Sequence, residues 1–173
     1  MSSKTFHGGV HPKEYKELTE HLAFELFPLP EQIVLPLSQH LGREAKALVK
    51  KGEDVKVGQM IAQAEGFVSA PVHTSVSGKV MSLGKEQTSS GFPKDSIVIK
   101  RNGTIESENI LLDPLNPETI TADEIRERVA LAGIVVQGGA AFPTAVKLSP
   151  PKDKVIDVVI LNGCECEPYL TRD

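Results

Sequence analysis

The chain has 173 residues, a formal net charge of −4 at neutral pH, 40% hydrophobic residues and 24% charged residues. This length allows one sizeable core or two small ones, and the composition is that of an ordinary globular protein without the basic face that nucleic-acid binding needs. No apolar run reaches the roughly 20 residues of a membrane-spanning helix, and the first residues lack the apolar segment of a signal peptide, which favours a cytoplasmic location.

Residues 1–30 contain several glycines and prolines and little periodicity, so we expect an extended arm laid over a neighbouring surface. His7 and His11 flank a pair of glycines in this arm. Two histidines alone are a weak signal for a metal site. A structural or solvated role is therefore the favoured interpretation of both.

Residues 31–112 have a β texture, in which short apolar runs are separated by glycine turns. This pattern predicts a small antiparallel β-sandwich or barrel. The runs lie at residues 32–37, 45–66, 70–84 and 95–100. Gly52 and Gly58 give two of the turns the backbone freedom they need, Ser77 and Gly78 mark a bend, and residues 84–94 are expected to form a loop.

A polar, proline-containing linker ends this domain near residue 112, and residues 113–173 form the third predicted part. This part begins with a helix. Thr121 as N-cap and Glu124 three residues later predict a capping box, and Ile125 and Val129 share one face. Gly133 is expected to cap the C-terminus of the helix.

A glycine turn follows, between a predicted short strand at residues 134–136 and a second helix. The turn contains Gly138, Gly139 and Ala140. Uncovered backbone N–H groups and a helix N-terminus together suit a phosphate or a flavin edge. Such a turn is more often only a turn, but Lys147, one turn into the helix, strengthens the case because it can reach back toward an anion.

Residues 155–161 form an apolar run broken only by Asp157, which predicts a strand covered on both faces, as in a parallel sheet. Asn162, Glu165 and Glu167 follow at its carboxyl end, where open α/β sheets bind ligands. The two carboxylates would point to one side and accept hydrogen bonds from a ribose or an amide. The alternative is a solvent-facing acidic loop.

Cys164 and Cys166 are the only cysteines of the chain. They are separated by one residue, which is too close for an easy disulfide. Two cysteines are also too few for a zinc or iron–sulfur site. We therefore expect no metal cluster in this segment.

The strings LVKKGEDVKVGQMIAQAEG and APVHTSVSGKV contain both glycine turns of the β region. Through them the region resembles a biotinyl/lipoyl-type barrel-sandwich hybrid domain. Carriers of that type present a modifiable lysine at a hairpin tip, whereas the tip at residues 65–70 has no lysine. A covalent swinging arm is therefore disfavoured, and a structural or docking use is favoured. Phe67 and Val68 would form an apolar knob suited to contact with a partner.

Six further strings follow one another along the chain: GGVHP at 8–12, PLSQHLG at 36–42, AEGFVSAPVH at 64–73, AGI at 132–134, FPTAVKLSPP at 142–151 and ECEPYLT at 165–171. Through them nearly the whole chain resembles the C subunits of Rnf-type electron transport complexes. A more distant resemblance is to the flavin-bearing, NADH-oxidising subunit of respiratory complex I.

The resemblance implies an α+β, multi-domain fold. An N-terminal barrel-sandwich hybrid, biotinyl/lipoyl-like and all-β, is followed by the truncated start of an α/β flavin-binding domain of complex I type. Members of the family continue through a ubiquitin-like β-grasp module and a ferredoxin-like region with two cysteine clusters. We therefore expect a truncated chain that is inactive alone, with 4Fe-4S clusters only in the missing C-terminal region. An unprotected strand at residues 155–161 would pair with a second copy.

The resemblance also implies sites for FMN and NAD(H), with no catalytic acid or base and no metal ligand in this segment. The residues that match the cradle of flavin mononucleotide are Gly138, Gly139, Ala140 and Phe142. Lys147 matches a lysine on the phosphate side and Asn162 an asparagine on the flavin. Glu165 and Glu167 match carboxylates near the flavin and the nicotinamide nucleotide. Two positions depart from the pattern, since Val136 stands in place of a glycine and Cys164 in place of an aspartate.

In function, the resemblance implies a peripheral subunit on the cytoplasmic side of the cell membrane. It would belong to an ion-translocating NADH/ferredoxin oxidoreductase, a translocase that moves electrons through flavin and iron–sulfur centres. Its partners would be the other subunits of the complex and, through them, ferredoxin. The alternative is a non-catalytic docking and assembly module within the same complex, and a covalent carrier is the third and least favoured interpretation.

Overall fold

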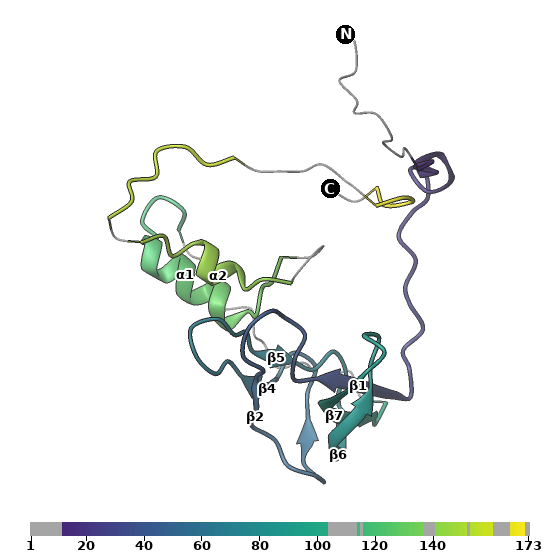
Figure 1. Ribbon diagram of the computed structural model, residues 1–173. Helices are drawn as coiled ribbons and strands as arrows, with labels where there is room; N and C mark the ends of the chain where they lie inside the picture. The colour runs from purple at the N-terminus through teal and green to yellow at the C-terminus, as the bar shows by residue number, and fades with distance from the viewer. Residues whose placement is uncertain are drawn as a thin grey trace. The chain divides into compact units, whose positions relative to one another are not determined.

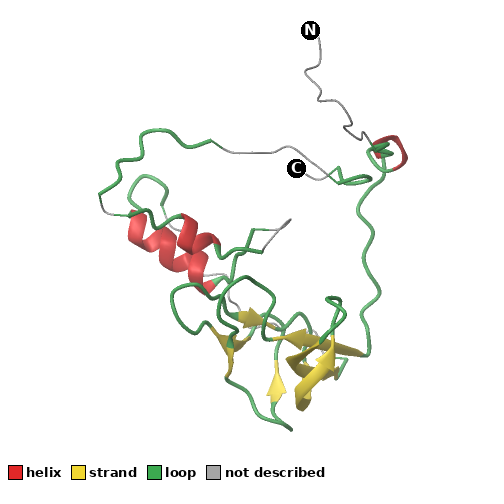
Figure 2. Cartoon of the chain, in the orientation of Figure 1, coloured by secondary structure: helices red, strands yellow, loops and turns green. Residues whose placement is uncertain are grey.

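The computed structural model of the chain describes residues 12–103, 114, 116–136, 141–151, 153–160 and 167–171 (Figure 1). The chain divides into two compact units, and each is described by itself. One unit is Leu29–Lys154, and the other combines Met1–Pro28 with Val155–Asp173. Among the described residues, all strands and both α-helices belong to the first unit (Figure 2).

The larger unit begins with short strands and ends with two helices. The described strands are β1 (Gln32–Pro36), β2 (Lys46–Ala47), β3 (Asp54–Val55), β4 (Met60–Gln63), β5 (Val72–His73), β6 (Gly78–Gln87) and β7 (Pro93–Arg101). The helices are α1 (Ala122–Leu131) and α2 (Thr144–Lys147).

Two antiparallel sheets make up the β part. One has the strand order β1-β7-β6-β3 and the other the order β2-β4-β5. The long β6–β7 hairpin runs from the pair Gly78 and Arg101 to the pair Gln87 and Pro93, with a register shift after Val80. The predicted barrel-sandwich architecture is therefore confirmed. The loop expected at residues 84–94 is shorter than predicted, because both strands extend into it and leave only residues 88–92.

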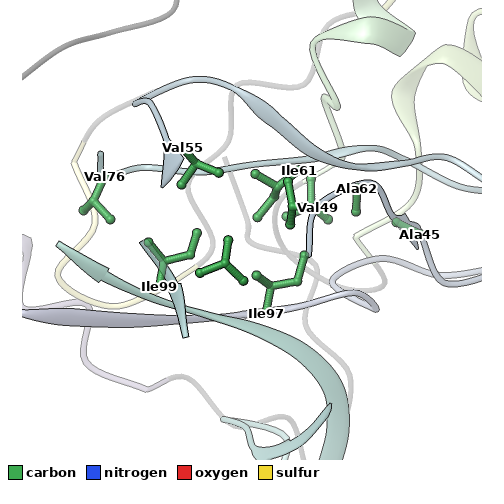
Figure 3. Packing of buried hydrophobic residues seen from close by; sticks show 10 residues of the cluster. Ala45, Val49, Val55, Ile61, Ala62, Val76, Ile97 and Ile99 are labelled. Carbon is green, nitrogen blue, oxygen red and sulfur yellow. The ribbon is translucent and has the colours of Figure 1, made fainter. Parts of the chain in front are cut away.

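The core lies between these two sheets (Figure 3). Ile61 of β4 faces Ile97 and Ile99 of β7, and all three side chains are fully buried, with 0% exposure. Val55 and Val80 pack in the same cluster. Burial of an aliphatic side chain of this size stabilises a fold by roughly 1.5–3 kcal/mol. The inward-facing residues of the predicted apolar runs therefore hold the two sheets together.

Glycine is required in the β part for two different reasons. Gly52 and Gly58 have φ angles of +88° and +87°, which confirms that they supply the left-handed conformations of the predicted turns. Gly78 has no such φ angle, but a Cβ atom there would lie 2.1 Å from the carbonyl oxygen of Lys100. At the predicted bend, glycine is therefore required because two strands approach closely there.

The predicted helix is confirmed as α1, together with its capping box. The Thr121 hydroxyl accepts a hydrogen bond from the Glu124 backbone N–H, and the Glu124 carboxylate accepts one from the Thr121 N–H. Ala132 is the C-cap, one residue earlier than predicted. Gly133 follows with φ +68°, and the Ile134 N–H donates to the Val129 carbonyl, as in a Schellman motif.

The predicted buried strand at residues 155–161 is wrong for the residues that are described. Residues 155–160 form no strand, and Val155 and Ile160 are 92% and 86% exposed. A strand needs hydrogen-bonded neighbours and side chains that cover its faces, and within the described ranges no strand pairs with this run. Leu161 lies outside the described residues. The strand predicted at residues 134–136 is only a single bridge, between Val135 and Pro143.

The smaller unit brings residues near the two ends of the chain together. The rings of Tyr15 and Tyr169 stack with centroids 5.3 Å apart. The Tyr169 N–H donates to the Glu14 carbonyl, and the Thr19 hydroxyl donates to the Tyr169 carbonyl. A 3-10 turn, Lys16–Leu18, lies in the middle of these contacts. The Lys16 ammonium donates to the Leu170 carbonyl at 2.8 Å, so the predicted arm is tied, in its described part, to residues 169 and 170.

The helices found among the described residues are too short or too polar to cross a membrane.

Candidate functional site

The glycine turn is closed at its base by backbone hydrogen bonds. The Val136 N–H donates to the Phe142 carbonyl and the Thr144 N–H donates to the Ile134 carbonyl, both at 2.9 Å. Ala141 adopts a left-handed conformation with φ +47°, and its carbonyl accepts a hydrogen bond from the Leu41 N–H at 3.3 Å. Gly138, Gly139 and Ala140 lie outside the described residues. The two ends of the turn are nevertheless fixed next to each other and next to the β part.

Phe142 and Lys147 lie on the segment that leaves this turn. Phe142 is half-buried, and Pro143 is buried at the start of α2. The Lys147 side chain is exposed, in the last position of the four-residue helix. The structure therefore places an exposed ammonium group one helical turn after the glycine turn, as the sequence predicted.

The acidic half of the predicted site is described only in part. Asn162 and Glu165 lie outside the described residues, as does Cys164. Glu167 is exposed and belongs to the smaller unit. Phe142 and Lys147 are thus the predicted residues that the structure shows on one segment.

A cavity of about 570 Å³ opens beside Ala141. It lies between the loop that follows β1 and the loop that joins β6 to β7. Its lining consists of residues 38–41, residues 88–90, Lys94 and Ala141. Sequence reasoning missed these residues as a site. The available signals were the three consecutive hydroxyl residues at 88–90 and the lysine that follows them.

His40, which lines this cavity, also fixes the hairpin tip at residues 65–70. Its Nε2 atom accepts a hydrogen bond from the Ala70 N–H at 2.7 Å. The Ser69 hydroxyl lies 3.2 Å from the same nitrogen and 2.8 Å from the Arg43 carbonyl. Burial lowers the pKa of His40, and a hydrogen bond with the Arg43 backbone offsets part of that effect. The ring is therefore a neutral acceptor near pH 7.

The predicted apolar knob at the hairpin tip is reduced to one residue. Phe67 is 73% exposed. Val68 is half-buried, and its carbonyl accepts a hydrogen bond from the Arg43 N–H at 2.9 Å. Gly42 allows this approach, because a Cβ atom there would lie 2.2 Å from the Val68 oxygen. Phe67 alone presents a large apolar surface at the tip.

A second, smaller cavity of about 290 Å³ lies where the end of α1 meets β5. His73 lines it, and its Nε2 atom is buried without a hydrogen-bond partner among the described residues. Burial lowers the pKa of His73. Gly133 makes this packing close, since a Cβ atom there would lie 2.7 Å from the Pro71 oxygen. The helical part therefore packs directly on the β part.

Two family profiles match the chain. Residues 4–104 match the RnfC Barrel sandwich hybrid domain, and residues 129–173 match the Nuo51 FMN-binding domain. The second match covers the glycine turn, α2 and the acidic segment. It agrees with the predicted start of an α/β flavin-binding domain.

Curated relatives resemble the chain along nearly its whole length. The C subunit of the proton-translocating ferredoxin:NAD(+) oxidoreductase complex of Clostridium ljungdahlii is 44% identical over 171 residues, which are 98% of this chain and 37% of the relative. The C subunit of the Na(+)-translocating ferredoxin:NAD(+) oxidoreductase complex of Acetobacterium woodii is 44% identical over 98% of this chain and 38% of its own length.

The C subunit of an ion-translocating oxidoreductase complex of Rhodobacter capsulatus is 42% identical over 100% of this chain and 34% of its own length. The chain thus spans little more than a third of the length of these relatives. Because the first profile covers more than half of the chain and the observed fold is the one it describes, the chain belongs to the RnfC barrel-sandwich hybrid domain family.

Proposed function

We propose that this chain is the N-terminal part of the C subunit of a membrane-bound, ion-translocating ferredoxin:NAD oxidoreductase, where it contributes to FMN and NADH binding and to electron transfer. The observation that carries the proposal is the match of residues 129–173 to the FMN-binding domain, beside 42–44% identity to three such subunits. The other subunits, and ferredoxin through the complex, would be its partners on the cytoplasmic side of the membrane.

In the proposed nucleotide site, the glycine turn would hold the flavin. The proposed contacts are those of Gly138, Gly139, Ala140 and Phe142 with FMN, of Lys147 with its phosphate, and of Asn162, Glu165 and Glu167 with the flavin and the nicotinamide nucleotide. The flavin would supply hydride-accepting and one-electron chemistry, and the residues of this chain would bind and orient it. The 4Fe-4S clusters would lie in the longer polypeptide.

The described geometry fits an FMN phosphate near the turn. Hydrogen bonds already hold both ends of the turn. The turn therefore loses less conformational entropy when a ligand binds and orders it. The exposed Lys147 ammonium has donors to offer an anion. Val136 departs from the family pattern, but its N–H is used at the base of the turn. Val136 therefore stands at the base of the turn.

FMN titration of the chain, followed by quenching of flavin fluorescence, tests this proposal. Lys147→Gln removes the charge and should weaken FMN binding about tenfold, as expected for one charge-assisted hydrogen bond. Lys154→Gln is the matched control, because Lys154 is exposed and belongs to the same unit. Equal FMN affinity in both variants would remove Lys147 from the site, and absence of binding in the unmodified chain would reject the flavin role for this segment.

The second candidate function is docking and assembly within the same complex. It is favoured by the apolar side chains of the N-terminal arm, of which Phe24 and Leu26 are 95% and 98% exposed. Exposed apolar groups at this density usually contact a partner. If the chain fails to bind FMN but still captures the other subunits, and Phe24→Ser with Leu26→Ser abolishes that capture, docking is the function of this part.

A further inference from the structure

The cavity between the β1 loop and the β6–β7 hairpin has the chemistry of an anion site. Lys94 is half-buried, and its ammonium group donates a hydrogen bond to the Ser38 carbonyl at 3.2 Å. An ammonium group has three donors, so this contact orients the charge over the cavity and leaves donors for a ligand. Among the described residues that line the cavity, none carries a carboxylate.

The hairpin loop is built to present a hydroxyl group. The Thr88 hydroxyl contacts the Ser90 hydroxyl at 2.8 Å and the Phe92 carbonyl at 2.9 Å, and the Gly91 N–H donates to the Thr88 carbonyl. These contacts fix the loop by itself. Ser89 lies between these residues and lines the cavity. Its hydroxyl is available to donate to a ligand oxygen.

One acidic residue, Glu86, lies close enough to Lys94 to affect the binding of an anion. Glu86 stands opposite Lys94 in the β6–β7 register, and side chains of directly opposite residues lie on the same face of a sheet. In the described structure the two side chains form no ion pair. The charge of Lys94 is therefore not neutralised by its neighbour, although Glu86 would weaken the attraction for an anion.

We propose that this cavity binds a phosphoryl group of a nucleotide, held by the Lys94 ammonium and the Ser89 hydroxyl. A volume of about 570 Å³ lies in the range of small-molecule sites, roughly 300–1,000 Å³. Ala141, which directly follows the glycine turn in sequence, forms part of the wall. The barrel-sandwich part would thus supply one wall of the nucleotide site. The assignment of the phosphoryl group to FMN or NADH rests on the proposed function.

Calorimetric titration of the chain with inorganic pyrophosphate tests the anion site directly. We expect Lys94→Gln to weaken binding about tenfold. Ser89→Asp, at an exposed position, should abolish binding by placing a negative charge in the site, and Glu86→Gln should strengthen it. Lys100→Gln is the matched control, because Lys100 is an exposed lysine on the same strand outside the cavity. Circular dichroism establishes that each variant is folded.

The outcomes separate this inference from the proposed function. The inference is overturned, even if FMN binds, by either of two results. One is that pyrophosphate does not bind, and the other is that it binds the Lys94→Gln and Lys100→Gln variants with equal affinity. Pyrophosphate binding that depends on Lys94 and Ser89 supports it even if neither FMN nor ADP-ribose binds, a result that would count against the proposed function. ADP-ribose, the part of NADH that carries its phosphates, separates the two sources. If Lys94→Gln weakens the binding of ADP-ribose alone, the phosphoryl group is that of the nicotinamide nucleotide. If it weakens the binding of FMN alone, the phosphoryl group is that of the flavin.

Discussion

Alanine substitution at two glycines of the same strand gives a sharp test of the β architecture. Gly78 and Gly84 both lie on β6, and neither has a positive φ angle. A Cβ atom at Gly78 would lie 2.1 Å from the Lys100 oxygen and 2.8 Å from its carbonyl carbon, whereas one at Gly84 would meet nothing within 4 Å. The two variants therefore add the same methyl group in opposite surroundings.

The expected magnitudes follow from these distances. Optimal contacts of carbon atoms lie at about 3.5–4.0 Å, so Gly78→Ala must push β6 away from β7 at the first pair of the hairpin. Overpacking of this kind costs about 1–3 kcal/mol or more. Gly84→Ala adds no clash and restricts the unfolded chain, which should leave stability unchanged or raise it by up to about 1 kcal/mol.

Urea denaturation followed by circular dichroism measures this difference. We expect the free energy of unfolding of Gly78→Ala to lie at least about 1 kcal/mol below that of Gly84→Ala. Equal stabilities of the two variants, or a more stable Gly78→Ala, would show that β6 and β7 do not approach at Gly78 as described, and the strand register would then be wrong.

Two further predictions concern charge and exposure. His40 and His73 both have a lowered pKa in the folded chain, so the unfolded state takes up protons first. The stability that their neutral rings contribute is complete above about pH 6.5 and should fall as the pH decreases from there toward the lowered pKa values. The midpoint of urea unfolding should show this slope, and His40→Gln with His73→Gln should remove it. The apolar side chains exposed at residues 155–160 should associate with a second copy. Val158→Lys should therefore yield monomers in sedimentation experiments at concentrations where the unmodified chain and Thr119→Lys form dimers, and monomers throughout would show that this run does not mediate association.

Local signals allowed the β part and α1 to be predicted from the sequence. Gly52 and Gly58 occupy turns that need φ above zero, and Thr121 with Glu124 forms a reciprocal cap. Each signal depends on residues only a few positions apart. The strands β6 and β7 extend further than the sequence predicts, and the loop between them is correspondingly shorter. Polar residues such as Lys85 and Glu86 pair across strands as readily as they form a loop.

Long-range features could not be predicted in the same way. Apolarity at residues 155–160 predicted burial, but burial also requires a covering partner, which periodicity does not reveal. The cavity beside Ala141 joins residues 38–41 to residues 88–94. About fifty positions separate these segments, and the pairing of β1 with β7 brings them together.

Reduction of bound flavin by NADH tests the central claim most directly. The polypeptide extended to the full length of its relatives would be loaded with FMN, and NADH would be added without oxygen. The proposed function predicts that the flavin absorbance is bleached, that Lys147→Gln loads less FMN, and that Lys154→Gln behaves as the unmodified protein does. A fully loaded protein whose flavin stays oxidised in the presence of NADH would contradict the claim.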